Sequence, residues 1–210
     1  MSRASRRRVL CSIAALAGAL AVPGRAADDD EAVTAPVRAF YDALLDAMRR
    51  AKALGINGRY DRLAPAIESA FDLAAMTRIA IGPRWTSIPK EQQAALVDGF
   101  SRMTIATYAN RFDGYSGERF DVEPAVDTRS SGKVVHTRLV QSNGEPVSLD
   151  YLMRTSGGGW KIVDVYLTGT ISELATRRSE FAAILNAGGA SALIDSLRQQ
   201  AGKLLRPSAG

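Results

Sequence analysis

The stretch VSLDYLMRTSGGGWKIVDVYLT, residues 147–168, has the two-residue period of paired β-strands. In its first half, apolar residues stand at every second position: Val147, Leu149, Tyr151 and Met153. In its second half, strict alternation puts Lys161, Val163, Val165 and Leu167 on one face and Trp160, Ile162, Asp164 and Tyr166 on the other. The three glycines between the halves predict a hairpin turn, because no helix follows them as it would in a phosphate-binding loop.

The same period extends toward the N-terminus. Phe120 and Val122 alternate with charged residues, and a further strand is predicted around residues 135–139. Asn143-Gly144 is a strong hairpin signal between that strand and the one that begins at Val147. These strands follow one another without an intervening helix, so the sequence predicts an antiparallel meander.

Residues before the strands have a helical period instead. The expected helices are one from Val33 to Met48, ending before Gly55; a stretch over 60–71 that Pro65 interrupts; a short one over 73–81, capped by Asp72; and one from Pro89 that ends by Gly114. Between the first two, Asn57-Gly58 predicts a break in the chain.

The helical period returns after Gly169. Two helices are expected there, separated by Gly188-Gly189, with the last one over 192–205. Helices, an antiparallel meander and helices again make an α+β domain in which helices cover one sheet face.

The N-terminus reads as an export signal. Arginines cluster at positions 3–8, an apolar run covers 9–22, and small residues precede a cut after Ala26. The apolar run is too short for a spanning helix, which needs about 20 residues. We therefore expect a signal peptide over 1–26 and a single domain over 27–210. Arg6-Arg7 leaves open whether the route is general secretion or twin-arginine export.

The positive charge of the chain belongs to this leader. The whole chain has 27 basic and 22 acidic residues, a formal net charge of +5. The leader carries five arginines and no acid, so the remaining domain has 22 residues of each sign. This balance gives no support to a nucleic-acid partner. The single cysteine, Cys11, also lies in the leader, so the domain suits an oxidising compartment.

Few residues suggest catalysis. One cysteine and one histidine, His136, exclude a metal site rich in these residues. Candidate acid–base groups on the strands are Asp150, Asp164, Tyr151 and Tyr166. Such residues also serve structure, and no nucleophile motif surrounds His136. We expect no enzyme, no metal and no cofactor. The apolar helix faces are compatible with two structures, a packed core or a cavity for acyl chains.

Three stretches resemble the MlaC family of periplasmic ABC-transport auxiliary proteins. The first is FDLAAMTR, 71–78, with GPRW, 82–85, and PKEQ, 89–92. The second is GEPVSLDYLMR, 144–154, with GWKIVDV, 159–165. The third runs from Gly169 to Phe181. Three further segments, 57–65, 108–114 and 168–174, are similar to the hopanoid-associated HpnM branch of the family.

The resemblance implies helices packed on an antiparallel, NTF2-like sheet with a lipid cavity between them. It implies a monomeric periplasmic carrier of phospholipid or hopanoid-type lipid, which works between an inner-membrane ABC transporter complex and an outer-membrane lipid complex. The expected lipid-binding residues are Tyr41, Leu44, Leu45, Met48, Phe71, Met76, Ile79, Trp85, Phe100, Met103, Tyr108, Val163, Val165 and Leu167. Two alternatives stay open: an enzyme on this scaffold that acts on a polycyclic lipid, and a docking subunit that carries nothing.

Overall fold

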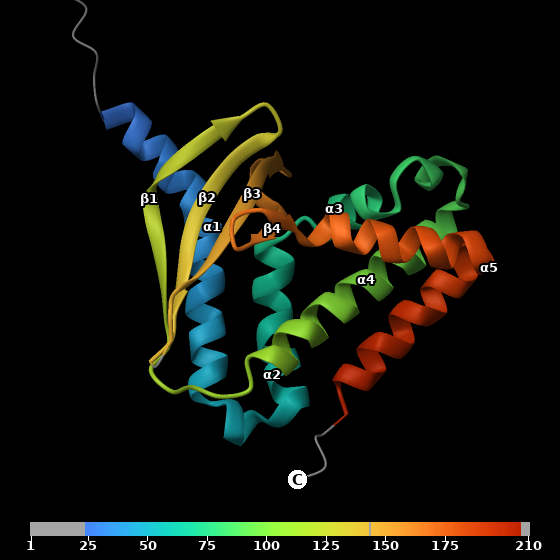
Figure 1. Ribbon diagram of the computed structural model, residues 1–210, viewed down its shortest axis with the longest axis horizontal. Coiled ribbons are helices and arrows are strands. Elements are labelled where there is room, and N and C mark those ends of the chain that lie inside the picture. Colours follow the sequence, from blue (N-terminus) through green and yellow to red (C-terminus); the bar gives the residue numbers. More distant parts are fainter. Residues whose placement is uncertain (1–23, 143, 207–210) are drawn as a thin grey trace, which may run out of the picture.

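The computed structural model has the predicted order of helices, antiparallel strands and helices (Figure 1). It describes residues 24–142 and 144–206. The helices are α1 (Gly24–Arg49), α2 (Ala51–Ala70), α3 (Leu73–Ile81), the 3₁₀ helix η1 (Gly82–Ser87), α4 (Lys90–Arg111) and α5 (Glu173–Leu204). The strands are β1 (Arg119–Arg129), β2 (Gly132–Val140), β3 (Val147–Ser156), β4 (Gly159–Leu167) and β5 (Ile171–Ser172). The predicted leader lies outside the described residues except for 24–26, where α1 begins.

The five strands form one sheet in the order β1-β2-β3-β4-β5, and every neighbouring pair is antiparallel. The predicted meander is therefore confirmed. Between β3 and β4, Gly157 and Gly158 have φ of 60° and 84°. A two-residue hairpin turn needs this left-handed backbone, which glycine adopts without steric cost.

The predicted alternation in β4 is wrong at Val163. Leu152 pairs with Asp164, but the next pair is Met153 with Ile162, so Val163 is an extra residue, a β-bulge. Ile162 and Val165 consequently face the main core together. Val163 instead packs with Val134 and Leu152 in a separate cluster against Ala75 of α3.

Two predicted helix breaks are absent, although the predicted end before Gly55 is confirmed. The helical backbone breaks at Gly55, with φ of 61°, whereas Asn57-Gly58 lies inside α2. Glycine allows this left-handed backbone, so the turn needs no other breaker. Pro65 does not interrupt α2, which continues through it to Ala70. The break predicted in the last helix is confirmed, because Gly189 has φ of 68° within α5.

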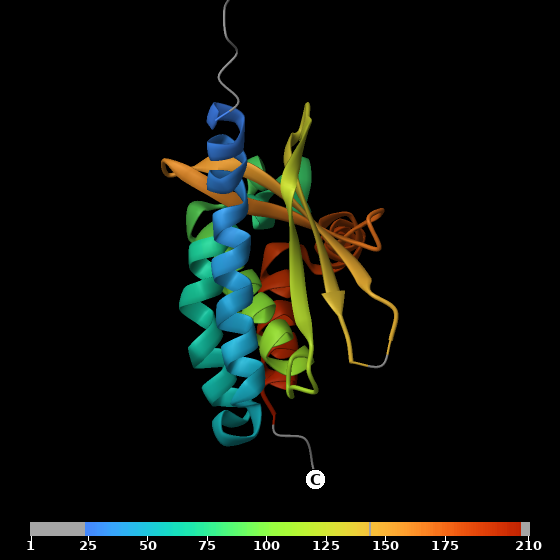
Figure 2. The ribbon, with the colours of Figure 1, turned by 90° about the vertical axis from the view of Figure 1, so that its left-hand side faces the viewer.

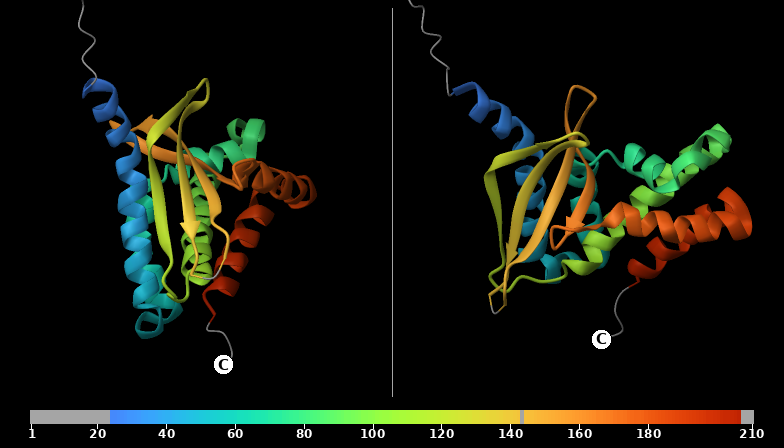
Figure 3. Two further views of the ribbon diagram at one scale, coloured as in Figure 1. Left: turned by 60° about the vertical axis from the view of Figure 1, so that its left-hand side comes forward. Right: turned by 45° about the horizontal axis from the view of Figure 1, so that its top comes forward.

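The helices lie in two groups around the sheet. In Figure 2, α1 and α2 run side by side next to the sheet, and α1 contacts β1, β2 and β4. On the other side, α5 folds back along α4, as both views of Figure 3 show. Among the described helices, none is long and apolar enough to cross a bilayer.

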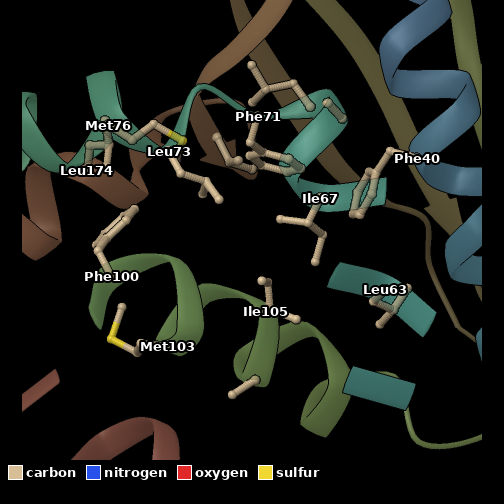
Figure 4. Close-up of a cluster of buried hydrophobic side chains, with 14 of the residues drawn as sticks. Phe40, Leu63, Ile67, Phe71, Leu73, Met76, Phe100, Met103, Ile105 and Leu174 are labelled. Atoms are coloured by element: carbon tan, nitrogen blue, oxygen red, sulfur yellow. The ribbon is translucent and has the colours of Figure 1, made fainter. Parts of the chain in front are cut away.

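The main core fills the space between the helices and the inner sheet face. Figure 4 shows Leu63 and Ile67 of α2 facing Ile105 of α4, and Phe100 of α4 facing Met76 and Leu174. Phe40 of α1 meets Phe71 edge to face, with ring centroids 5.2 Å apart. These side chains are largely shielded from water, and the hydrophobic effect stabilises each by about 1.5–3 kcal/mol.

Two aspartates, the half-buried Asp72 and the buried Asp164, fix the starts of two helices. Asp72 Oδ1 accepts a hydrogen bond from Ala75 N at 2.8 Å, which confirms the predicted cap of α3. Asp164 Oδ1 accepts from Val165 N at 2.8 Å and Leu174 N at 3.2 Å, and Asp164 Oδ2 accepts from Ser172 Oγ at 2.5 Å. Asp164 thus fixes the start of α5 to β4.

His136 lies on the opposite, outer face of the sheet. Its Nε2 is 3.0 Å from Asp127 Oδ2 of β1, and its Nδ1 is 3.1 Å from Asp150 Oδ1 of β3. Burial lowers the His136 pKa, but the hydrogen bonds and charges of the two carboxylates raise it more, so the pKa lies above 6.5. The imidazole therefore links three strands.

Asp164→Ala should lower the free energy of unfolding by about 3 kcal/mol, because it leaves two buried backbone N–H groups unpaired. Urea unfolding followed by circular dichroism measures this loss. The matched control is Asp121→Ala, which removes an exposed carboxylate from a surface pair with Arg119 and should cost less than about 1 kcal/mol. Equal losses in both variants would contradict the role of Asp164.

The contacts of His136 with Asp127 and Asp150 should make the free energy of unfolding depend on pH. Because the folded pKa is raised, the stabilisation is complete below about pH 6.5 and is lost as the pH rises through the folded pKa. The unfolding free energies of wild type and His136→Gln should therefore differ most near pH 5.5 and converge toward about pH 8. A difference that is constant, or that grows with pH, would show that the contacts between His136 and the two carboxylates do not stabilise the fold.

Candidate functional site

A cavity of about 130 Å³ lies between the helices and the inner sheet face. Helices α1, α3, α4 and α5 contribute to its wall, as do β1, β3 and β4. The lining residues are Tyr41, Leu44, Phe71, Met76, Phe100, Met103, Thr104, Thr107, Tyr108, Arg111, Phe112, Phe120, Leu149, Tyr151, Val165, Leu167, Glu173, Leu174 and Arg177. Most of this wall is apolar.

Nine of the fourteen residues predicted to bind lipid line this cavity. They are Tyr41, Leu44, Phe71, Met76, Phe100, Met103, Tyr108, Val165 and Leu167. Their apolar side chains converge from α1, α3 and α4 and from the sheet onto one space, although up to 126 positions separate them in the sequence.

The other five predicted residues lie elsewhere. Leu45 follows Leu44 on α1 and is rotated about 100° away from it. Met48 is buried one turn further along the same helix, and Ile79 and Trp85 are half-buried against the core from α3 and η1. Val163 faces the separate cluster because of the β4 bulge.

Ten lining residues were not predicted. Thr104, Thr107 and Arg111 continue the helical spacing of Phe100 and Met103, so the period of α4 could have indicated them. Leu149 and Tyr151 share the alternating face of β3. Phe120 belongs to the alternating face of β1, whereas Phe112, Glu173, Leu174 and Arg177 lie at or near helix ends, where the period is a weak guide.

The charged residues of the wall mark its boundary with solvent. Arg111 ends α4, and Glu173 and Arg177 lie one turn apart at the start of α5. Arg111 is exposed, Glu173 and Arg177 are half-buried, and Arg177 Nη1 is 2.8 Å from Glu180 Oε2. We call Arg111, Glu173 and Arg177 the charged rim. Its two cations and one anion give it a net positive charge.

Hydroxyl groups interrupt the apolar wall near the sheet. Tyr41 Oη of α1 lies 2.9 Å from Tyr151 Oη of β3 and 2.7 Å from Thr137 Oγ1 of β2, within hydrogen-bond distance of both. Thr137 Oγ1 in turn donates to the Leu149 carbonyl at 2.5 Å. Burial raises the pKa of Tyr41, Tyr108 and Tyr151 above the usual 10, so all three phenols keep their protons at neutral pH.

Of the candidate acid–base groups, Tyr151 lines the cavity, whereas Tyr166, Asp150 and Asp164 do not. His136 and Asp150 lie on the outer face and do not line the cavity, and the Asp164 carboxylate already accepts three hydrogen bonds. Within residues 24–142 and 144–206, no group of three His, Cys, Asp or Glu side chains could hold a metal ion. The wall is therefore suited to holding an apolar molecule with a polar end.

Comparisons with known proteins match this geometry. The family model described as "MlaC protein" matches residues 38–199. A solved structure of the phospholipid-binding protein from Ralstonia solanacearum, in complex with a phospholipid, is 25% identical, with a TM-score of 0.72. The similarity covers 83% of this chain and 99% of that one. No curated protein matches. Since the family model spans more than half of the sequence, the chain belongs to the MlaC family.

Proposed function

We propose that this protein is a lipid carrier that holds acyl chains in the cavity and leaves the polar headgroup at the charged rim. The observation that carries the proposal is the cavity itself, whose apolar wall ends in charged groups on one side. Each CH₂ group that the wall shields from water contributes about 0.8 kcal/mol. A lipid can thus be held in aqueous solution without any covalent or catalytic group.

The cavity must enlarge to hold a whole lipid. Its volume of about 130 Å³ is close to that of an engineered cavity of about 150 Å³ that binds benzene. Pockets for larger ligands have about 300–1,000 Å³. Met76 and Met103 line the wall, and methionine side chains change shape easily, so they can move aside as acyl chains enter.

Phospholipid and hopanoid-type lipid are the proposed cargoes. The similar protein from Ralstonia solanacearum binds a phospholipid, which supports the first. The resemblance to the HpnM branch supports the second, and its segments 108–114 and 168–174 contribute Tyr108, Arg111, Phe112, Glu173 and Leu174 to the wall. Residues typical of that branch therefore lie where they would contact a ligand.

The site of action that we propose is the periplasm. The predicted leader over 1–26 supports export, and the balanced charge of the remaining domain suits a protein that leaves each membrane again. As a monomer, it would exchange lipid with an inner-membrane ABC transporter complex and an outer-membrane lipid complex. Neither an enzymatic reaction nor a nucleic-acid partner is part of this proposal.

Protein produced in a periplasm and purified without detergent should carry bound lipid. Native mass spectrometry measures the added mass, and fragmentation of the bound species identifies a phospholipid or a hopanoid. Protein stripped of lipid should take it up again from vesicles. Protein that is consistently lipid-free and takes up none from vesicles would contradict the carrier function.

Met103→Trp should reduce lipid binding by roughly tenfold, because the larger ring occupies the cavity and overpacking costs about 1–3 kcal/mol. Lipid occupancy after incubation with vesicles measures the effect. Leu45→Trp is the matched control, since Leu45 is half-buried and outside the cavity wall. If Met103→Trp stays folded and binds lipid like wild type, the cavity is not the lipid site.

A further inference from the structure

Arg59 of α2 is a buried cation that makes no ion pair with any described residue. It is 8% exposed; its Nε donates to the Ala109 carbonyl at 2.8 Å, and its Nη1 donates to the Ala51 carbonyl at 3.1 Å. A guanidinium carries five N–H donors and stays charged, so three donors have no partner among the described residues. Buried charges are normally paired, and this pattern indicates an anion that is not part of the fold.

Arg59 lines a hollow of about 680 Å³ at the end of the molecule where α2 begins and α4 and α5 end (Figure 1). The polar residues of its wall are Lys52, Asn57, Arg59, Asn110, Asp113 and Arg206. This wall shares no residue with the wall of the cavity between the helices and the sheet. The hollow is therefore a second site, which the proposed carrier function does not use.

The unused donors of Arg59 lie at this hollow. Nη2 makes no hydrogen bond to a described residue, yet the described residues contain no fully enclosed side-chain nitrogen that lacks a partner, so Nη2 keeps exposed surface. Ala51, which accepts from Nη1, lines the hollow together with Arg59. Because the guanidinium is a rigid plane, Nη2 lies beside Nη1 at the same wall. An ion that enters the hollow can thus reach the guanidinium directly.

The charges around the hollow favour a doubly charged anion. Lys52 and Arg206 are exposed and make no ion pair with a described residue, and Asp113 is the single acidic residue among the described residues of the wall. Together with Arg59, three cations and one anion leave two positive charges. A phosphate monoester carries a charge of about −1.5 to −2 at neutral pH and has three strong acceptor oxygens. It matches both the charge of the wall and the three free N–H groups, whereas a carboxylate neutralises only half of this charge.

We propose that the hollow around Arg59 binds the phosphate group of a phosphate monoester, supplied by a small soluble molecule or by a lipid headgroup such as that of phosphatidic acid. Arg59 holds the phosphate through charge-assisted hydrogen bonds, and Lys52 and Arg206 attract it from the rim of the hollow. The volume lies within the range of about 300–1,000 Å³ that is typical of small-ligand sites, so the organic part of the monoester also has room.

The test is a titration of ¹⁵N-labelled protein with glycerol 3-phosphate, followed by the NMR signals of the Arg59 side chain and of the backbone around the hollow. Wild type should saturate with a dissociation constant of the order of 1 mM, and glycerol should cause no shift. Lys52→Ala/Arg206→Ala should weaken binding about 3- to 10-fold, because two exposed cations are lost. The matched control is Arg102→Ala/Arg198→Ala, which removes two exposed arginines outside the hollow and should bind like wild type.

Flotation with vesicles distinguishes the two sources of the phosphate. Protein that floats with vesicles of phosphatidylcholine and phosphatidic acid, but not with phosphatidylcholine alone, takes a lipid headgroup, provided that Lys52→Ala/Arg206→Ala loses this binding. Saturation by glycerol 3-phosphate without flotation identifies a soluble monoester.

Two results would overturn the phosphate site. The first is a lack of saturation by glycerol 3-phosphate together with a lack of flotation that depends on phosphatidic acid. The second is equal weakening in the two double variants, which would assign the binding to the general surface charge. Arg59→Lys keeps the charge but loses the fork of donors, so it should abolish saturation. The four cations of the double variants are exposed, so these variants test the site even where Arg59→Lys impairs folding.

Discussion

The distance between α1 and the sheet depends on the hydroxyl of Tyr41. This side chain is 3% exposed and links α1 to β2 through Thr137 and to β3 through Tyr151. Its ring also stacks on Phe120 of β1, with centroids 4.1 Å apart. Hydrogen bonds have a narrow range of length, so these contacts fix how closely α1 approaches the sheet. Leu44, one turn along α1, then faces the cavity rather than the strands.

A second constraint holds the other side of the cavity. The extra residue in β4 turns Val163 away and leaves Ile162 and Val165 facing the core, so the strand contacts both the main cluster and α3. Directly after the bulge, Asp164 binds Ser172 and the backbone of Leu174. The bulge and this carboxylate together fix the first turn of α5, which contributes Glu173, Leu174 and Arg177 to the wall. The cavity thus lies between α1 and the start of α5, and polar contacts fix both of these elements to the sheet.

The sequence indicated much of this arrangement because its signals are local. Strand alternation predicted β3. Gly157-Gly158 predicted the hairpin turn after it, and Asp72 predicted the cap of α3; the structure confirms both. Predictions were wrong where the outcome depends on tertiary contacts. The bulge at Val163 turns that side chain toward α3 while β4 stays paired with β3. The break predicted at Asn57-Gly58 is absent because α2 continues through these residues, whereas the predicted helix end before Gly55 is confirmed. Periodicity also cannot distinguish a side chain that packs in the core from one that lines a cavity. Met48 and Met103 were therefore both predicted to bind lipid, although only Met103 lines the cavity.

For the proposed carrier function, the source of the lipid determines how much modest polar contacts contribute to binding. Acyl chains that enter from a membrane leave one apolar environment for another, so the large hydrophobic term nearly cancels between donor membrane and carrier. What remains is the cost of enlarging a cavity of about 130 Å³, the packing against Met76 and Met103, and a few hydrogen bonds. A hydrogen bond contributes only about 1 kcal/mol net, which is small enough for the proposed carrier to release its lipid again. In this balance, lipids that are equally apolar differ in affinity only through their packing and their polar contacts.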